Sequence, residues 1–160
     1  MSVNVKQFTD LVIVPTLESM PRRSAFDLDA EISLALMCAA HESHMGSFLK
    51  QVKGPALGMY QMEPRTHDDI WVDGTEGRAD IRGWLYSWAC LGGPLEADEA
   101  EEMTWNHRYA TAMFRAHFIR FKEAIPKSLE DQAKYLKKYW NVTGKATAQE
   151  YLQDYRRYVQ

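Results

Sequence analysis

Residues 29–45 are the stretch that most constrains how this chain can fold. They begin with acidic side chains, which suit the positive end of a helix dipole, and continue into the apolar run 34–40. Four of these residues are spaced so that they lie on one face of a helix: Ile32, Ala35, Ala39 and Glu42. The sequence therefore predicts a core helix over 29–45 whose apolar face ends in a carboxylate.

This helix ends in the sequence His-Glu-Ser-His-Met, which differs from a zinc-protease signature by one residue of spacing. In that signature the second histidine follows the first by four residues, whereas His44 follows His41 by three. Zinc would need at least a third ligand, and no motif in the chain places one. It would have to come from a carboxylate or from one of the other histidines: His67, His107 and His117. We therefore expect no metal and no other cofactor.

The glutamate between the two histidines has two interpretations. At a helix end, Glu42 can reach water or pair with an arginine, because an unpaired glutamate is rarely fully buried. Alternatively, its place at the edge of an apolar stripe removes part of its hydration, and this raises the pKa of a carboxyl group. A carboxyl group that keeps its proton near neutral pH can deliver it to a leaving group. On this second interpretation Glu42 is a general acid.

The rest of the chain also favours helices, separated by proline and glycine. Pro15 is expected to end a first short helix, whereas Pro64 suits the first turn of another. Glycines and a proline in residues 46–63 indicate a loop or short strand. The acidic run 96–102 is interpreted as the solvated start of a helix. Further helices are expected at 5–14, 98–124, 129–140 and 148–159, the last with the capping-box pair Thr147 and Glu150.

Length and composition limit the classes of protein to which the chain can belong. A chain of 160 residues, 46% of them hydrophobic, suits a single domain over residues 1–160. The formal net charge of −3 argues against nucleic-acid binding, which usually needs a basic excess. The apolar run 34–40 is the longest and is too short to span a bilayer. We predict a mostly α-helical protein that binds no nucleic acid and does not insert into a membrane.

A second segment, GPALGMYQMEPRT at residues 54–66, extends the pattern that begins at Glu42. Together with Glu42-Ser43 it resembles the lytic transglycosylases of the goose-type lysozyme superfamily. Their pattern is Glu-Ser at the end of an apolar helix, followed by G-A-x-G-L-M-Q-x-x-P-x-T. The matching positions are Ala56, Gly58, Met59, Gln61, Pro64 and Thr66. The resemblance implies a lysozyme-like fold, with a small irregular or β segment after the catalytic helix.

The same resemblance implies which side chains bind a glycan. It makes Glu42 the catalytic acid, and Gln61 offers an amide that can hydrogen-bond a sugar or orient the glutamate. Gly58 permits a backbone conformation that a side chain would block. The other substrate-binding candidates of this region are Ser43, Met59 and Tyr60, although core packing is the better default for Met59.

Family members also have a late motif, roughly A-Y-N-A-G. The matching piece is KYWNVTGKAT at residues 138–147, where Asn141 fits the pattern. The aromatic position falls on Trp140, or on Tyr139 if the register slips by one residue. A weaker match, TWNHRYATAM, places Asn106 near the wall of the cleft.

The chemistry that the resemblance implies is cleavage of the β-1,4 bond between N-acetylmuramic acid and N-acetylglucosamine in peptidoglycan. Glu42 would protonate the bridging oxygen, while the acetamido oxygen of the substrate shields the positive charge on the ring. Glu42 would then accept the proton of the C6 hydroxyl as a 1,6-anhydro ring closes. One carboxylate is sufficient for this transglycosylase reaction.

Two other functions remain open at this point. A hydrolytic muramidase needs a second carboxylate, about 5–5.5 Å away as a nucleophile or about 6.5–9.5 Å away to activate water. The candidates follow the glycine-rich turn: Glu63, Asp68, Asp69 and Asp73. A virion structural or glycan-binding protein of the same fold, without catalysis, is the other alternative.

The expected partner is the glycan strand of peptidoglycan, and the expected site of action is the bacterial cell wall. The N-terminus shows no pattern of a secretory signal. We therefore expect a protein made in the cytoplasm of a bacterial host, which acts as a phage endolysin or as a component of the virion.

Overall fold

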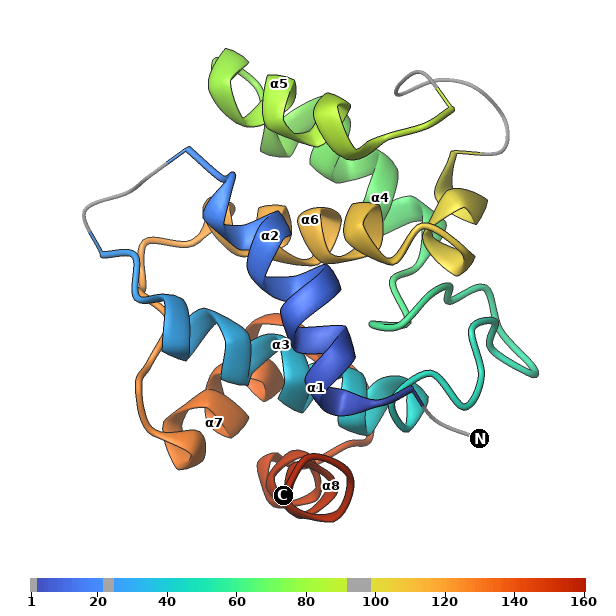
Figure 1. The fold of residues 1–160 in the computed structure, drawn as a ribbon, viewed down its shortest axis with the longest axis vertical. Helices are drawn as coiled ribbons and strands as arrows, with labels where there is room; N and C mark the ends of the chain where they lie inside the picture. The colour runs from blue at the N-terminus through green and yellow to red at the C-terminus, as the bar shows by residue number, and fades with distance from the viewer. Residues whose placement is uncertain (1–2, 22–24, 92–98) are drawn as a thin grey trace.

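Helix α3 (Leu28–Ser43) lies at the centre of the fold (Figure 1). The computed structural model describes residues 3–21, 25–91 and 99–160. Asp27 caps α3, since its side chain accepts a hydrogen bond of 3.0 Å from the backbone N–H of Ala30. The left-handed backbone of His44, with φ of 49°, ends the helix. The predicted core helix is confirmed, with its ends displaced by one and two residues.

The N-terminal helical rod differs from the prediction at Pro15. Helix α1 (Val5–Phe8), the π-helical turn η1 (Thr9–Ile13) and α2 (Val14–Glu18) follow one another without a break. Pro15 lies in the first turn of α2, so it does not end the helix. The wide π turn before it leaves room for the pyrrolidine ring, which would clash with a carbonyl in a regular helix interior.

Short helices follow the loop that leaves α3. Helix α4 (Pro64–Asp69) begins at its proline as predicted and continues into the π-helical turn η2 (Ile70–Gly74). Helix α5 (Ala79–Trp88) then turns back and packs against α6 (His107–His117). These elements form the upper part of the molecule in Figure 1.

The single helix predicted over 98–124 is wrong. The described residues of this range form a 3₁₀ turn η3 (Ala100–Thr104), then α6, then a second 3₁₀ turn η4 (Phe118–Arg120). The break falls at Asn106, whose side chain accepts a hydrogen bond of 3.1 Å from the backbone N–H of Tyr109 and so starts α6 afresh.

The acidic run 96–102 differs in part from its interpretation as a solvated helix start. Residues 96–98 lie outside the described residues. Glu102 is buried, and its carboxylate accepts hydrogen bonds from the backbone N–H groups of Cys90 (2.7 Å) and Leu91 (3.1 Å). A buried carboxylate with such partners ties the chain together instead of facing water.

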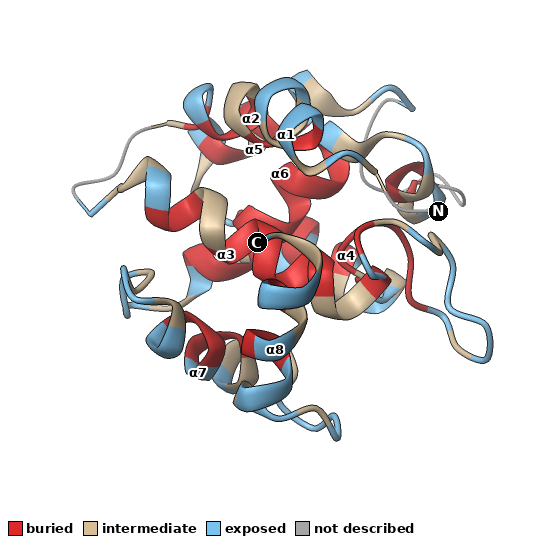
Figure 2. Cartoon of the chain, turned by 60° about the horizontal axis from the view of Figure 1, so that its bottom comes forward, coloured by how far each residue is buried: buried red, intermediate tan, exposed pale blue. Residues whose placement is uncertain are grey.

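Two C-terminal helices complete the domain and cover α3 from below in Figure 1. Helix α7 (Leu129–Tyr139) and helix α8 (Ala148–Tyr158) pack on α3 and on each other. Thr147 and Glu150 form the predicted capping box at the start of α8. Figure 2 shows that α7 and α8 have both buried and exposed residues, as amphipathic surface helices do, whereas α3 and α6 are buried over most of their length.

Arg115 and Glu31 form a buried ion pair in the core. Arg115 of α6 donates a hydrogen bond of 2.8 Å from Nη2 to Oε1 of Glu31 on α3, and a second from Nε to Oε2. Their side chains are 9% and 3% exposed. Burial raises the pKa of the Glu31 carboxyl group, although the Arg115 guanidinium acts to lower it.

The segment between α3 and α4 is irregular. Two isolated bridges, Lys50 with Leu57 and Leu57 with Met62, are its extended pairings. The expectation of a mostly α-helical domain with an irregular segment after α3 is therefore confirmed. Among the described residues, no helix is both long and apolar enough to cross a membrane.

Candidate active site

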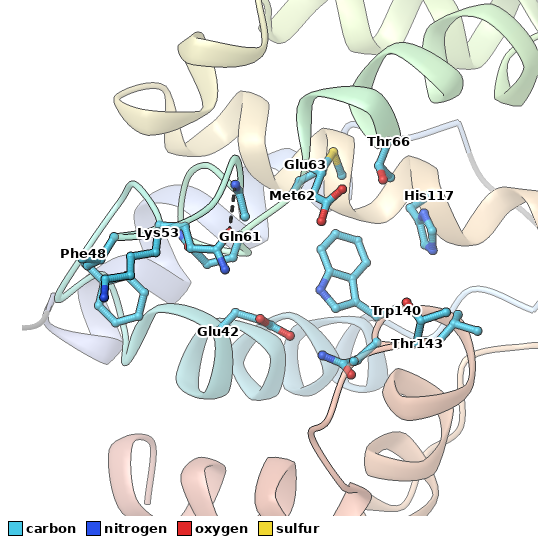
Figure 3. Close-up of a pocket in the computed structure, with 16 residues that line it drawn as sticks. Glu42, Phe48, Lys53, Gln61, Met62, Glu63, Thr66, His117, Trp140 and Thr143 are labelled. Atoms are coloured by element: carbon cyan, nitrogen blue, oxygen red, sulfur yellow. Dashed lines mark hydrogen bonds between the residues drawn. The ribbon is translucent and has the colours of Figure 1, made fainter.

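A cleft of about 780 Å³ opens beside the C-terminal turn of α3 (Figure 3). One wall is the irregular segment after α3, with the start of α4, and the opposite wall is the loop after α7. Six of the residues that line it matter most for chemistry: Glu42, Lys53, Gln61, Glu63, Trp140 and Asn141. Segments far apart in the sequence thus meet at one hollow, as binding sites generally require.

Glu42 extends from the last turn of α3 into this cleft (Figure 3). Burial raises the pKa of its carboxyl group, because desolvation disfavours the charged form. Hydrogen bonds from Tyr151 and Asn141 and the charge of His41 act in the opposite direction, but burial prevails. Glu42 therefore has the environment of a group that holds a proton and can release it.

Tyr151 of α8 is the closest partner of this carboxyl group. Its hydroxyl donates a hydrogen bond to Glu42 Oε1. The phenol is buried, and burial raises its pKa, so it stays a hydrogen-bond donor. The ring of His41 packs over the Tyr151 ring with a centroid separation of 4.1 Å, and His41 Nδ1 donates to Asp154 Oδ2 at 2.8 Å. Helix α8 thereby fixes one side of Glu42.

The glycine–glutamine turn has the backbone that its sequence predicted. A side chain at Gly58 would bring a Cβ atom to 2.5 Å from the Met103 carbonyl oxygen, and its φ is +76°. Only glycine fits such a position without strain. Gln61 also has a positive φ, 50°, which is uncommon for a residue other than glycine.

The Gln61 side chain holds this turn together and still faces the cleft. Its Nε2 donates a hydrogen bond of 2.8 Å to the carbonyl oxygen of Gly58. Among the described residues, the amide oxygen of Gln61 has no partner, and the side chain lines the cleft. That oxygen is available to accept a hydrogen bond from a ligand.

The late motif contributes Trp140 and Asn141, but not Tyr139. Trp140 lines the cleft and packs edge-on against His117 at a centroid separation of 5.0 Å. Tyr139 points elsewhere: its hydroxyl donates to Glu123 Oε2 at 2.7 Å and its ring stacks on another aromatic residue. Of the two aromatic candidates, Trp140 is therefore the one that lines the cleft. Lys137 Nζ holds the following loop by donating to the Asn141 carbonyl oxygen at 2.9 Å.

Several predicted substrate-binding residues do not line the cleft. Ser43 is buried and bonds to the backbone at Ala39 and Gly46. Met59 and Tyr60 belong to the core, where the Tyr60 hydroxyl lies 2.9 Å from Thr111 Oγ1. Asn106 is a helix cap that also donates to the Trp88 carbonyl oxygen. Ser43 and Tyr60 directly adjoin lining residues in the sequence but do not enter the site, because successive residues face different directions.

Of the four candidates for a second carboxylate, only Glu63 lines the cleft. Its exposed side chain is directed towards Trp140 in Figure 3. Asp68 instead lies 2.9 Å from the Nδ1 atom of buried His67. Asp69 and Asp73 act electrostatically on Arg120 outside the cleft.

Tyr151 is a residue of this site that the sequence did not indicate. Its contact with Glu42 spans 109 residues of sequence and depends on the packing of α8 against α3.

The described residues contain no group of three or more histidine, cysteine, aspartate or glutamate side chains arranged to hold a metal.

Comparison with protein-family models, with curated proteins and with solved structures finds no match. The function of the cleft is therefore inferred from its own residues.

Proposed function

We propose that the chain is a peptidoglycan lytic transglycosylase with a lysozyme-like fold. It would act on the glycan strands of the bacterial cell wall, at the bond between N-acetylmuramic acid and N-acetylglucosamine. The observation that supports this most strongly is a glutamate with a raised carboxyl pKa at a cleft bordered by Gln61 and Asn141. General acids of glycosidases have this environment.

Glu42 is the proton donor in this proposal. Tyr151 donates to Oε1 of its carboxyl group, and Oε2 would present the acidic proton to the bridging oxygen. When the glycosidic bond breaks, the electron pair stays with that oxygen, which takes the proton of Glu42. The oxygen of the C6 hydroxyl then bonds to C1 and closes the anhydro ring. As it does so, the Glu42 carboxylate accepts the proton of that hydroxyl. Glu42 ends the cycle protonated.

The cleft offers separate contacts for the sugar rings. The free amide oxygen of Gln61 can accept a hydrogen bond from a hydroxyl or from an acetamido N–H. Trp140 lines the cleft with an aromatic ring, which can pack against the apolar face of a sugar. Asn141, which bonds to Glu42, can keep its carboxyl group oriented while substrate binds.

Hydrolysis is the second candidate function, and Glu63 favours it because it is a second carboxylate in the same cleft. The two reactions leave different ends. We expect digestion of purified cell walls to release muropeptides with 1,6-anhydro ends, which mass spectrometry detects as one water lighter than reducing ends. If wild type instead produces reducing ends, and the Glu63→Gln variant does not, the mechanism is hydrolysis.

A change of Tyr151 to phenylalanine is expected to shift the pH profile of cleavage. The tyrosine hydrogen bond lowers the pKa of Glu42, so its loss raises that pKa further. A general acid works while it is protonated, and the alkaline limb of kcat/KM should therefore move to higher pH in Tyr151→Phe. Tyr155→Phe, on the same helix, is the matched control and should leave the limb in place. An unchanged limb in Tyr151→Phe would contradict the proposed role.

A further inference from the structure

A second hollow, of about 490 Å³, lies beyond His117. It is bordered by the start of α3, by η4 with the segment that follows it, and by α7. None of the residues that line it lines the first cleft. The proposed cleavage reaction gives it no role.

The hollow presents cations that lack partners. Arg78 and Lys122 line it, and neither side chain forms a hydrogen bond or ion pair within the described residues. Arg120 is a third cation of the wall, and Asp69 and Asp73 partly balance its charge from outside the hollow. Guanidinium and ammonium groups arranged in this way favour an anionic ligand.

The two carboxylates of the hollow do not neutralise these cations, because both have partners of their own. Glu31 is paired with Arg115 in the buried ion pair. Glu123 accepts hydrogen bonds from Lys138 Nζ at 2.6 Å and from the Tyr139 hydroxyl at 2.7 Å. Within the described lining, Arg78 and Lys122 therefore remain as unopposed charges.

The remainder of the wall is apolar. It includes the side chains of Phe26, Phe118, Phe121 and Ile125. A bare inorganic anion would leave these side chains unused. A ligand with carboxylates and small apolar groups, such as a short acidic peptide, would satisfy both parts of the wall.

A single imidazole connects the two hollows. His117 lines the first cleft, while its Nδ1 atom accepts a hydrogen bond of 2.6 Å from Nη2 of Arg120, which lines the second. Its Nε2 donates to the Tyr139 carbonyl oxygen at 2.7 Å. In Figure 3, His117 stands at the end of the cleft that is remote from Phe48 and Lys53. His117 therefore joins the lining of the cleft to Arg120 in the lining of the cationic hollow.

We propose that the second hollow binds the acidic peptide attached to the muramic acid residue of the substrate. This rests on the proposed function of the first cleft. An extended peptide spans about 3.3–3.6 Å per residue, so a few residues suffice to pass one side chain. The carboxylates of the peptide would meet Arg78 and Lys122, and its small apolar side chains would meet the phenylalanines.

The test compares glycan strands with and without their peptides. The variant is the double change Arg78→Gln with Lys122→Gln, and the control is Lys134→Gln with Arg156→Gln, which removes the same charge from α7 and α8. We expect kcat/KM on peptide-bearing strands to fall about tenfold in the variant, since hydrogen bonds to charged groups are at stake. Cleavage of amidase-treated, peptide-free strands should be unchanged, and the control should match wild type on both.

Equal losses on both substrates, or no loss on either, would overturn the proposal. A second measurement tests the peptide site separately from the proposed function. It follows NMR shifts of the intact protein as the free acidic peptide of the muramic acid residue is added. If wild type cleaves neither kind of strand, the transglycosylase assignment fails. Even then, peptide binding by wild type that is lost in the Arg78/Lys122 variant would assign the hollow to an acidic peptide. If wild type does not bind the peptide, the assignment of the hollow is wrong as well.

Discussion

Replacing Glu42 by glutamine should lower the rate of glycan cleavage by about a hundred- to ten-thousand-fold, the range for loss of a general acid or base. Glutamine has nearly the same shape and can still accept a hydrogen bond from Tyr151, but it has no acidic proton for the bridging oxygen. Release of soluble muropeptides from purified cell walls, measured as initial rates, gives the comparison with wild type.

Two measurements make this result specific. Removing a carboxyl group whose pKa burial raises should not destabilise the fold, so the thermal unfolding midpoint of Glu42→Gln should equal or exceed that of wild type. Glu63→Gln, a second carboxylate change in the same cleft, should retain activity if the enzyme is a transglycosylase. Full activity of Glu42→Gln would remove the central residue of the proposed mechanism.

The helix that presents Glu42 could be predicted because its determinants are local. Asp27 caps α3 at the position where acidic residues begin, and the apolar stripe ends at the glutamate. The capping box at Thr147 and Glu150 fixed the start of α8 in the same way. Gly58 also follows from a local backbone requirement, which a short motif expresses directly.

The parts that the sequence did not reveal depend on contacts between distant segments. Tyr151 reaches Glu42 only because α8 packs on α3. Tyr139 and Trp140 are neighbours, and which of them enters the cleft depends on how α7 ends and on the partner at Glu123. Asn106 was mispredicted for a different reason. It is the N-cap of α6, a local role, but the weak match to a family motif placed it at the cleft wall.

The largest expected effect on stability concerns the buried pair of Arg115 and Glu31. Arg115→Met keeps an unbranched side chain of similar reach but leaves Glu31, only 3% exposed, without its cation. Breaking a buried ion pair by removing one partner costs about 3–5 kcal/mol, a large share of the roughly 5–15 kcal/mol that stabilises a typical domain. Urea unfolding followed by circular dichroism should show this decrease in the free energy of unfolding. Lys134→Met, at an exposed site of α7, should change it by less than about 0.5 kcal/mol.

The dependence of this loss on pH distinguishes an unpaired charge from a packing defect. Burial raises the pKa of Glu31 above its ordinary value of 4.5, and loss of Arg115 removes a contribution that lowers it. A carboxyl group with a raised pKa binds its proton more tightly in the folded state, so its contribution to stability falls as pH rises through that pKa. The deficit of Arg115→Met should thus be largest at neutral pH and shrink as pH falls towards 4.5. The double variant Glu31→Leu with Arg115→Met should recover most of the loss, whereas a deficit that is independent of pH and persists in the double variant would show that packing, not charge, is responsible.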